Sequence, residues 1–265
     1  MEVRVFPNSR RPGIGLKPKR EGTRPLLPQH ARHCPVLEAG SAAGFMVYAP
    51  LEPRESLYVE YEGEGVYKFV YYLESGGKPT PLFSVTMSLP IGSIGMMKED
   101  VQFAGVPMLS REAALAVARV FLVPEDMGTP PGAIALRGAS NFQTPAGWDT
   151  VYTPIFNMID RPFAPMLVVR VETDWYAHET EFRYVLQAGE GITVTHALPI
   201  GQVMFVPREE ITLRECTDSE IERIQAQQHE FSRHKSAAAQ KTPYGLTVSP
   251  HYLRQSRAQK SSQND

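Results

Sequence analysis

The chain has 265 residues, of which 42% are hydrophobic, and a formal net charge of −2 at pH 7. This length allows one large or two small domains, and the composition allows a buried core. No run of 18 apolar residues occurs and the charged N-terminus lacks an apolar segment, so we expect neither a membrane-spanning helix nor a secretory signal. The two cysteines, Cys34 and Cys216, form neither a disulfide framework nor a zinc site, and we expect a cytoplasmic, reducing setting.

The ends of the chain are basic and its middle is acidic. Residues 1–33 carry eight Lys or Arg against two Glu, and residues 231–264 carry six Lys or Arg and no acid. Residues 34–230 hold 13 basic and 26 acidic residues. Basic ends of this kind can contact an acidic partner or nucleic acid. They can equally be solvated tails, which is the simpler interpretation because neither end is a dense Lys/Arg block.

The first half of the chain predicts short strands joined by turns. The sequence has 23 Pro and 20 Gly and few long helical patterns, a composition that favours such folds. Residues 1–32 are rich in Pro and Arg without periodicity and predict a flexible arm, and a strand is expected at residues 44–50. Alternating residues around Gly63-Glu64-Gly65 predict a hairpin over residues 57–73, followed by a strand at residues 82–89.

The second half adds two helices and more strands. Ser110 is an N-cap for a helix that extends to about residue 119. Residues 133–142 and 148–156 predict strands on either side of a Thr-Pro-Ala-Gly turn, and three further strands are expected within residues 165–207.

The C-terminal region begins with a capping box. Thr217 and Glu220 stand three residues apart in front of a helix expected over residues 217–235. Residues 236–265 are polar, with few apolar residues, and predict a loose basic tail.

The order of elements in residues 165–207 resembles the dUTPase-like β-clip fold. An apolar strand runs into the acidic turn Glu172-Thr173-Asp174-Trp175, and the last strand is entered through Pro199-Ile200-Gly201-Gln202. The resemblance implies a mainly-β protein with a β-clip core at about residues 130–216. This core would belong to one globular domain over residues 33–216, with an N-terminal β-rich half packed against it and a C-terminal helix after it. β-clip proteins of this kind are often trimers, so the resemblance is compatible with a homo-oligomer.

A second resemblance is to uncharacterised phage and bacterial proteins of a domain-of-unknown-function family. The shared features are Cys34-Pro35, Gly44-Phe45, the Thr144-Pro145-Ala146-Gly147 turn and the corner Val171-Glu172-Thr173-Asp174-Trp175. They cover about residues 34–230. This resemblance implies a phage-related protein but no defined activity.

The comparison with dUTPases supplies candidate catalytic residues. Those enzymes have a strand ending in Gly-x-Ile-Asp-x-x-Tyr, whose Asp activates water, and the resemblance places Glu172 at this position with Asp174 nearby. The two carboxylates share a face if the segment is extended, and paired carboxylates can perform acid–base chemistry or bind a divalent ion. They can equally form the polar side of a turn in which Thr173 and Trp175 pack inward.

The residues that would handle a nucleotide are mostly missing. The Pro-Arg-Ser phosphate-binding segment of dUTPases corresponds to Thr153-Pro154-Ile155-Phe156-Asn157, which has no phosphate-binding side chain. The C-terminal arm of those enzymes, with its base-capping aromatic, has only a faint counterpart at Tyr244. The candidate ligand-binding residues are Arg170, Arg183, Trp175 and Tyr244.

No metal or cofactor is predicted. His178, Glu179, Glu181 and His196 could in principle ligate a metal, but a polar turn explains them better. His30 and His33 lie near Cys34, yet a single cysteine does not make a zinc site. Neither a dinucleotide-binding glycine motif nor a phosphate-binding loop occurs in the sequence.

Two hypotheses of function follow. The first is a non-catalytic binding or structural protein that uses the β-clip as a platform for assembly or ligand binding. The second is a hydrolase acting on a nucleotide-like or other small anionic substrate, with Glu172 and Asp174 as base or metal ligand. A deep pocket beside Glu172, lined by several of Arg137, Arg161, Arg170 and Arg183, would favour the enzyme.

Overall fold

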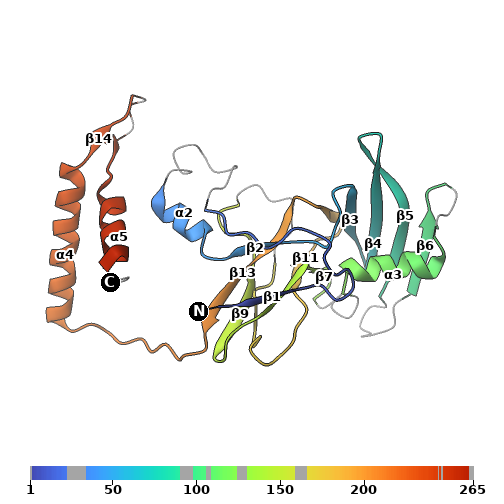
Figure 1. Cartoon of the computed structure of the whole chain (residues 1–265), viewed down its shortest axis with the longest axis horizontal. Helices are drawn as coiled ribbons and strands as arrows, with labels where there is room; N and C mark the ends of the chain where they lie inside the picture. The colour runs from blue at the N-terminus through green and yellow to red at the C-terminus, as the bar shows by residue number, and fades with distance from the viewer. Residues whose placement is uncertain are drawn as a thin grey trace. The chain divides into compact units, whose positions relative to one another are not determined.

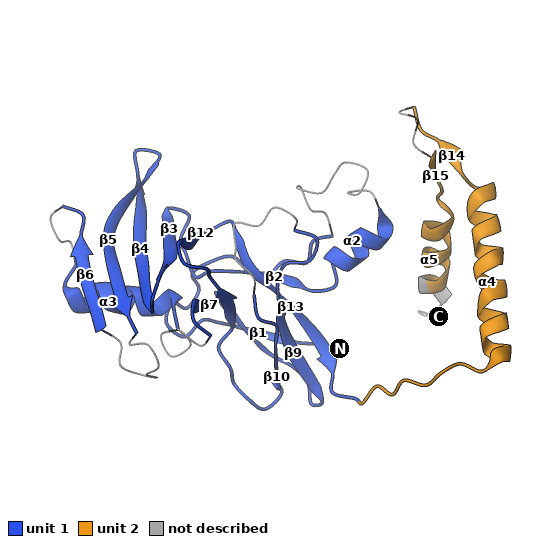
Figure 2. Ribbon diagram, turned by 180° about the vertical axis from the view of Figure 1, so that it is seen from behind, with its two compact units in different colours: residues 1–209 blue, residues 210–265 orange. Residues whose placement is uncertain are grey.

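A computed structural model of the chain describes residues 2–22, 34–89, 98–105, 109–123, 130–158, 166–243, 245 and 247–262. The chain divides into two compact units, Met1–Glu209 and Glu210–Asp265, which are coloured separately in Figure 2. Unit 1 is mainly β, as the sequence predicts, and its sheets are antiparallel. Among the described residues, no helix has both the length and the apolar character needed to cross a bilayer.

The larger sheet of unit 1 has five strands in the order β12-β3-β4-β5-β6. Its strands are β3 (Glu55–Gly63), β4 (Val66–Ser75), β5 (Lys78–Ser88), β6 (Lys98–Phe103) and β12 (Glu190–Thr195). The predicted β3–β4 hairpin is confirmed, and Gly63, Glu64 and Gly65 at its turn all have positive φ. The β4–β5 connection is also a tight hairpin, because Gly76 and Gly77 let β5 begin earlier than the sequence suggests.

The second sheet has four strands in the order β10-β9-β13-β2. These are β2 (Phe45–Tyr48), β9 (Trp148–Thr153), β10 (Val169–Val171) and β13 (Pro199–Pro207). Two strand pairs complete unit 1: β1 (Arg4–Pro7) with β8 (Ser140–Gln143), and β7 (Ala133–Arg137) with β11 (Glu181–Val185). The segment predicted as one strand over residues 133–142 is therefore two strands, because β7 and β8 pair with different partners.

The hydrophobic core joins these layers. One cluster of buried residues takes in both sheets and α3 (Arg111–Phe121), the helix that the Ser110 N-cap predicts. Phe121 of α3 stacks against Phe69 and Tyr71, with ring centroids 6.4 and 6.1 Å apart. Figure 1 shows α3 lying across the β4–β6 region of the larger sheet. Burial of this aromatic cluster anchors the helix to the sheet, since aromatic pairs add to the area that they bury.

The β-clip resemblance predicts a core at residues 130–216 with an N-terminal half packed against it in one domain. Strand pairing shows a different arrangement, because β12 pairs with β3 and β13 pairs with β2. Each of the two sheets thus contains strands from both halves of the chain. The two halves form one antiparallel structure, and the finer β-clip assignment is not established by these pairings.

The N-terminal segment is docked on unit 1, so the expectation of a flexible arm is wrong for its described residues, 2–22. β1 pairs with β8, and the buried side chain of Asn8 donates to the Gly138 carbonyl at 2.9 Å. Arg11 forms a bidentate ion pair with Glu55, with N–O distances of 2.6 and 3.0 Å. Lys19 and Met46 exchange two backbone hydrogen bonds. These anchors involve residues far apart in sequence, which a local pattern could not reveal.

A short helix that the sequence analysis missed, α2 (Pro35–Ser41), follows the arm. Cys34 occupies its N-cap position and Pro35 starts it, which is a favourable place for proline. Asn157 donates to the Leu37 carbonyl at 3.1 Å and ties the helix to the segment after β9.

Unit 2 contains α4 (Asp218–Ala237), β14 (Gln240–Lys241), β15 (Thr247–Val248) and α5 (His251–Ser262). The capping box of Thr217 and Glu220 is confirmed, and it is joined by an ion pair between Arg214 and Glu220 at 2.6 Å. The expected loose tail is instead a small hairpin followed by a helix. Phe231 of α4 packs on His251 of α5 with ring centroids 4.9 Å apart, a contact between distant residues.

We expect Gly15→Ala to destabilise the docked arm more than Gly13→Ala. Both glycines have positive φ, so each substitution costs about 1–2 kcal/mol in backbone strain. A Cβ at Gly13 meets open space, whereas one at Gly15 would lie 2.6 Å from the Ala139 Cβ and the Ala49 carbonyl oxygen. This overlap adds about 1–3 kcal/mol. Trypsin cleavage within residues 2–22 should accelerate strongly in the Gly15 variant, and equal rates in the two variants would contradict the close docking.

Removal of residues 210–265 is expected to leave the melting temperature of unit 1 within about 2 °C of the full chain. The reason is that every residue of the hydrophobic core cluster belongs to unit 1. Differential scanning calorimetry of a chain ending at Glu209 measures this. A drop of 10 °C would show that unit 2 stabilises unit 1 substantially.

Candidate functional site

The acidic corner predicted from the sequence is an ion-pair cluster centred on Asp149. Asp149 lies on β9, and its side chain is only 3% exposed. Its carboxylate accepts hydrogen bonds from Arg170 at 2.6 Å and from Arg208 at 2.5 and 2.9 Å. The sequence analysis missed Asp149, because its partners lie 21 and 59 residues away along the chain.

The two candidate catalytic carboxylates belong to this cluster. Asp174 accepts from Arg208 at 2.7 Å and from the Gly147 backbone N–H at 3.0 Å. Glu172 is half-exposed, accepts from the Trp175 indole N–H, and lies 3.8 Å from the Arg208 Nε. Each carboxylate is therefore held by a guanidinium or an N–H donor.

A buried layer of hydroxyl groups supports the corner from beneath. The Thr173 hydroxyl lies 2.9 Å from that of Thr144 and 2.6 Å from that of Thr150, and all three residues are buried. Thr173 packs inward, as the turn interpretation predicts, but Trp175 is 71% exposed and does not. Trp175 instead lies over the acidic turn and contacts Tyr176, with ring centroids 5.8 Å apart.

The electrostatic environment of the corner stabilises the charged forms of Asp149, Asp174 and Arg208. Burial raises the pKa of Asp149, but the hydrogen bonds from Arg208 and Arg170 outweigh it and leave that pKa below its usual value. Hydrogen bonds from Arg208 and Gly147 lower the pKa of Asp174. The pKa of Arg208 is raised by Asp149 and Asp174. A carboxylate with a lowered pKa is a weak general base at neutral pH, because catalytic efficiency requires a pKa near the working pH.

The other predicted ligand residues do not gather at the corner. Arg170 is part of the cluster, but Arg183 lies on β11, which pairs with β7. Arg137 is buried and forms ion pairs with Glu179 and Glu181. Tyr244 and Arg161, like His30 and His33, lie outside the described residues.

The candidate metal ligands have other partners. Glu179 and Glu181 face Arg137, His178 stacks on Tyr176, and the His196 Nδ1 lies 2.6 Å from the Leu51 carbonyl oxygen. Across the part of the chain that the structure describes, no three His, Cys, Asp or Glu side chains are placed to hold a metal ion.

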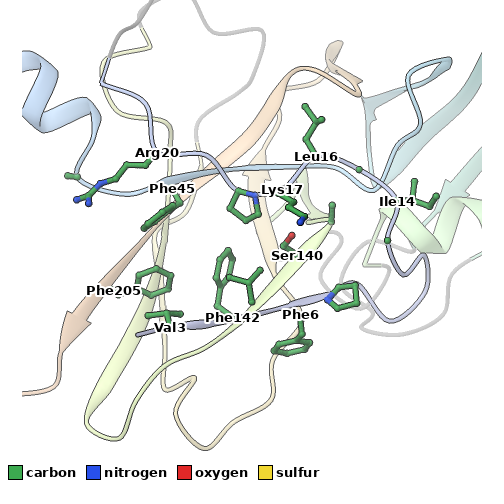
Figure 3. A pocket seen from close by; sticks show the side chains of 17 residues that line it. Val3, Phe6, Ile14, Leu16, Lys17, Arg20, Phe45, Ser140, Phe142 and Phe205 are labelled. Carbon is green, nitrogen blue, oxygen red and sulfur yellow. The ribbon is translucent and has the colours of Figure 1, made fainter. Parts of the chain in front are cut away.

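A cavity of about 730 Å³ lies between the arm and the body of unit 1. We call it the arm pocket. One wall is the arm itself, residues 3, 5–7, 13–18 and 20. The other is made by Ala43, by Phe45 of β2, by Ala139, Ser140 and Phe142, and by Phe205 of β13. Figure 3 shows the rings of Phe45, Phe142 and Phe205 along one side of the cavity, with Val3 of the arm beside Phe205 and Phe6 farther along the arm.

The arm pocket is mostly apolar. The centroid of the Phe205 ring lies 5.9 Å from that of Phe45 and 5.5 Å from that of Phe142, so the three rings form a continuous aromatic wall. Two cations, Lys17 and Arg20, and the Ser140 hydroxyl are the polar side chains among its lining residues, and no carboxylate is among them. Predominantly apolar walls with a few polar groups, in a volume of about 300–1,000 Å³, are typical of small-molecule sites.

The sequence analysis did not find the arm pocket, because it treated residues 1–32 as unattached. Two local signals pointed to it: the alternation of Val3 and Val5, which is typical of a strand, and the Gly13-x-Gly15 spacing, which allows a close approach of backbones. The partner surfaces lie more than 100 residues away in β8 and β13.

A scan against protein-family models finds no match to this chain, and no curated protein matches it. The site is therefore interpreted from its own geometry.

We expect Asp149→Asn to destabilise unit 1 by about 2 kcal/mol, because the two guanidinium groups then lose their buried carboxylate. Glu172→Gln should cost less than about 0.5 kcal/mol, since that side chain is half-exposed. Urea unfolding at pH 7 compares the two variants. A larger effect of Glu172→Gln would contradict the assignment of Asp149 as the centre of the cluster.

The lowered pKa values also predict a pH dependence of stability. Asp149 and Asp174 have folded-state pKa values below the unfolded value of about 3.9, so their contribution is fully present above that pH. It is lost as the pH falls through the lower folded-state values. Unfolding free energies measured between pH 2 and 7 should thus fall less steeply below about pH 4 in Asp149→Asn than in wild type. Identical slopes would contradict the ion-pair cluster.

Proposed function

We propose that this protein is a non-catalytic binding protein that takes a small, largely apolar ligand in the arm pocket. The observation that carries the proposal is the aromatic wall of Phe45, Phe142 and Phe205, which faces a cavity of about 730 Å³ closed on its other side by the arm. Filling such a cavity removes apolar ligand surface from water, which contributes about 25 cal/mol for each Å² buried.

The arm supplies one wall of the pocket, and this wall is anchored to unit 1. Val5 and Phe6 of β1 line the pocket and remain partly exposed, and among the described strands β1 pairs with β8 alone. Leu16 and Pro18 line the pocket between the backbone anchors at Asn8 and Lys19. A ligand that bridges the arm and the aromatic wall would stabilise the docked arm, because it binds that state and not the undocked one.

The hydrogen bonds of the acidic corner favour a binding function for the protein over a catalytic one. Asp149 and Asp174 are held by Arg208, and Glu172 accepts a hydrogen bond from Trp175, so their geometry serves to fix the turn after β10. The hydrolase hypothesis, with Glu172 and Asp174 as base or metal ligand, requires one of these carboxylates to be released from its partner. The arm pocket has no carboxylate among its lining residues that could perform this chemistry.

Further parts of the proposal come from the sequence. We also propose a dUTPase-like β-clip arrangement within residues 130–216 and membership of a phage-related family. A homotrimer goes with the β-clip, because β-clip proteins of this kind are often trimers. The unpaired state of Cys34 and Cys216 supports a reducing, cytoplasmic setting. Contacts of the basic ends with nucleic acid form a weaker alternative, since Arg11 and Arg20 are engaged within unit 1.

A polarity-sensitive dye such as anilinonaphthalene sulfonate tests the proposal. We expect saturable, one-site binding to the full chain at micromolar concentration, and about ten-fold weaker binding to Ala43→Trp, whose new ring occupies the rim of the pocket. Ala43 is exposed and lines the cavity, so the substitution should leave the core intact.

The matched control is Ala188→Trp, at an exposed alanine in the β11–β12 turn that does not line the cavity. This control should bind the dye like wild type. Equal dye affinity in wild type and both variants would exclude the arm pocket as the binding site.

A further inference from the structure

We propose that the ligand of the arm pocket is an amphiphilic anion, in which an elongated apolar body carries one anionic head group, and that Lys17 and Arg20 bind this head group. The inference rests on the proposed function, because it names the class of ligand for the same site. A carboxylate and a phosphate monoester share the required chemistry, and the experiment below distinguishes them.

The charged side chains that line the pocket are all cationic. Lys17 and Arg20 line it, and no Asp or Glu is among its lining residues. This is notable in a chain whose residues 34–230 hold twice as many acids as bases. A purely apolar ligand would leave two cations beside the cavity without an anionic partner, whereas an anion complements them.

Several arginines of unit 1 are neutralised by carboxylates, and Arg20 is not. Arg11 binds Glu55, Arg137 binds Glu179 and Glu181, and Arg208 binds Asp149 and Asp174. Within the described residues, neither Lys17 nor Arg20 has a carboxylate within ion-pair distance. The two positive charges at the pocket are therefore available to a ligand.

The Arg20 side chain is already held in place. Its Nε donates to the Ala42 carbonyl at 2.6 Å, and its guanidinium carbon lies 5.6 Å from the centre of the Phe45 ring. Figure 3 shows the Arg20 side chain extending beside Phe45, at one end of the aromatic wall. The terminal N–H groups of a guanidinium held in this way can form bidentate hydrogen bonds to a carboxylate or phosphate. Because the side chain is pre-positioned, less conformational entropy is lost on binding.

The apolar body of the ligand would lie along Phe142, Phe205 and Phe45. The Phe142 side chain is almost fully buried, so the wall is rigid at that point, while Phe45 and Phe205 are half-buried beside it. A ligand whose head group binds Arg20 and whose apolar body lies along these rings would contact both the cations and the aromatic wall of the pocket.

The experiment compares straight-chain carboxylates, phosphates and alcohols of 6 to 14 carbons by calorimetry on the full chain, below their aggregation concentrations. We expect affinity to increase about four-fold for each added methylene until the cavity is filled, the value that burial of one CH₂ gives. At a given length and low salt, the anions should bind about five-fold more tightly than the alcohol, and this difference should shrink at high salt. The tighter of the two anion series identifies the head group.

Lys17→Gln/Arg20→Gln tests the head-group site. The double variant should bind carboxylates, phosphates and alcohols equally well while keeping the dependence on chain length. Lys19→Gln is the matched control, because Lys19 is an exposed cation of the same arm that does not line the pocket, and it should keep the preference for anions.

The outcomes separate the two proposals. Affinity that does not depend on chain length overturns the proposed function, and the ligand class with it. A normal chain-length dependence with equal affinity for anions and alcohols in the wild type leaves the apolar pocket in place and overturns the anion site alone. A preference for anions that survives in the double variant overturns the assignment of Lys17 and Arg20.

Discussion

β13 is the strand on which both sites depend. It is hydrogen-bonded on its two edges, to β9 and to β2, and its first residues are buried, with Gln202 fully inaccessible. The Gln202 side chain accepts from the Phe156 backbone N–H and donates to the Ser41 carbonyl, which links the strand to segments on either side. Farther along the strand, Phe205 enters the arm pocket, and Arg208 follows immediately to reach Asp149. Displacement of this strand would disturb the pocket and the ion-pair cluster together.

The arm converts an exposed apolar face into a pocket. Without it, Phe45 and Phe205 would face solvent, and the hydrophobic effect favours covering them. The arm covers them only partly because it is anchored at Asn8, Arg11 and Lys19, and the chain between these anchors stands off from the aromatic wall. A ligand that contacts both walls, as we propose, would couple its binding to the docking of the arm.

The carboxylates of the acidic corner are engaged by guanidinium and N–H donors. Glu172, Asp174 and Asp149 face two guanidinium groups, and the Thr144, Thr150 and Thr173 hydroxyls satisfy one another below. A catalytic carboxylate needs an environment that raises its pKa toward neutrality, usually through desolvation without a cationic partner. At Asp149 and Asp174, hydrogen bonds from guanidinium groups lower the pKa instead. The exposed Trp175 and Tyr176 lie on the outer side of this fixed turn.

The sequence by itself determined the elements whose causes are local: the β3–β4 hairpin from its Gly-Glu-Gly turn, α3 from the Ser110 cap, and α4 from the capping box at Thr217. It also showed that the fold is mainly β. The tertiary structure alone decided the docking of β1, the pairing of β12 and β13 with N-terminal strands, the packing of α5 on α4, and the position of Asp149. These depend on contacts between residues up to about 160 positions apart, as in the pairing of Val203 with Phe45. Hydrogen-bond partners at such separations leave no periodic signal in a single sequence, whereas turns and caps are encoded within a few residues.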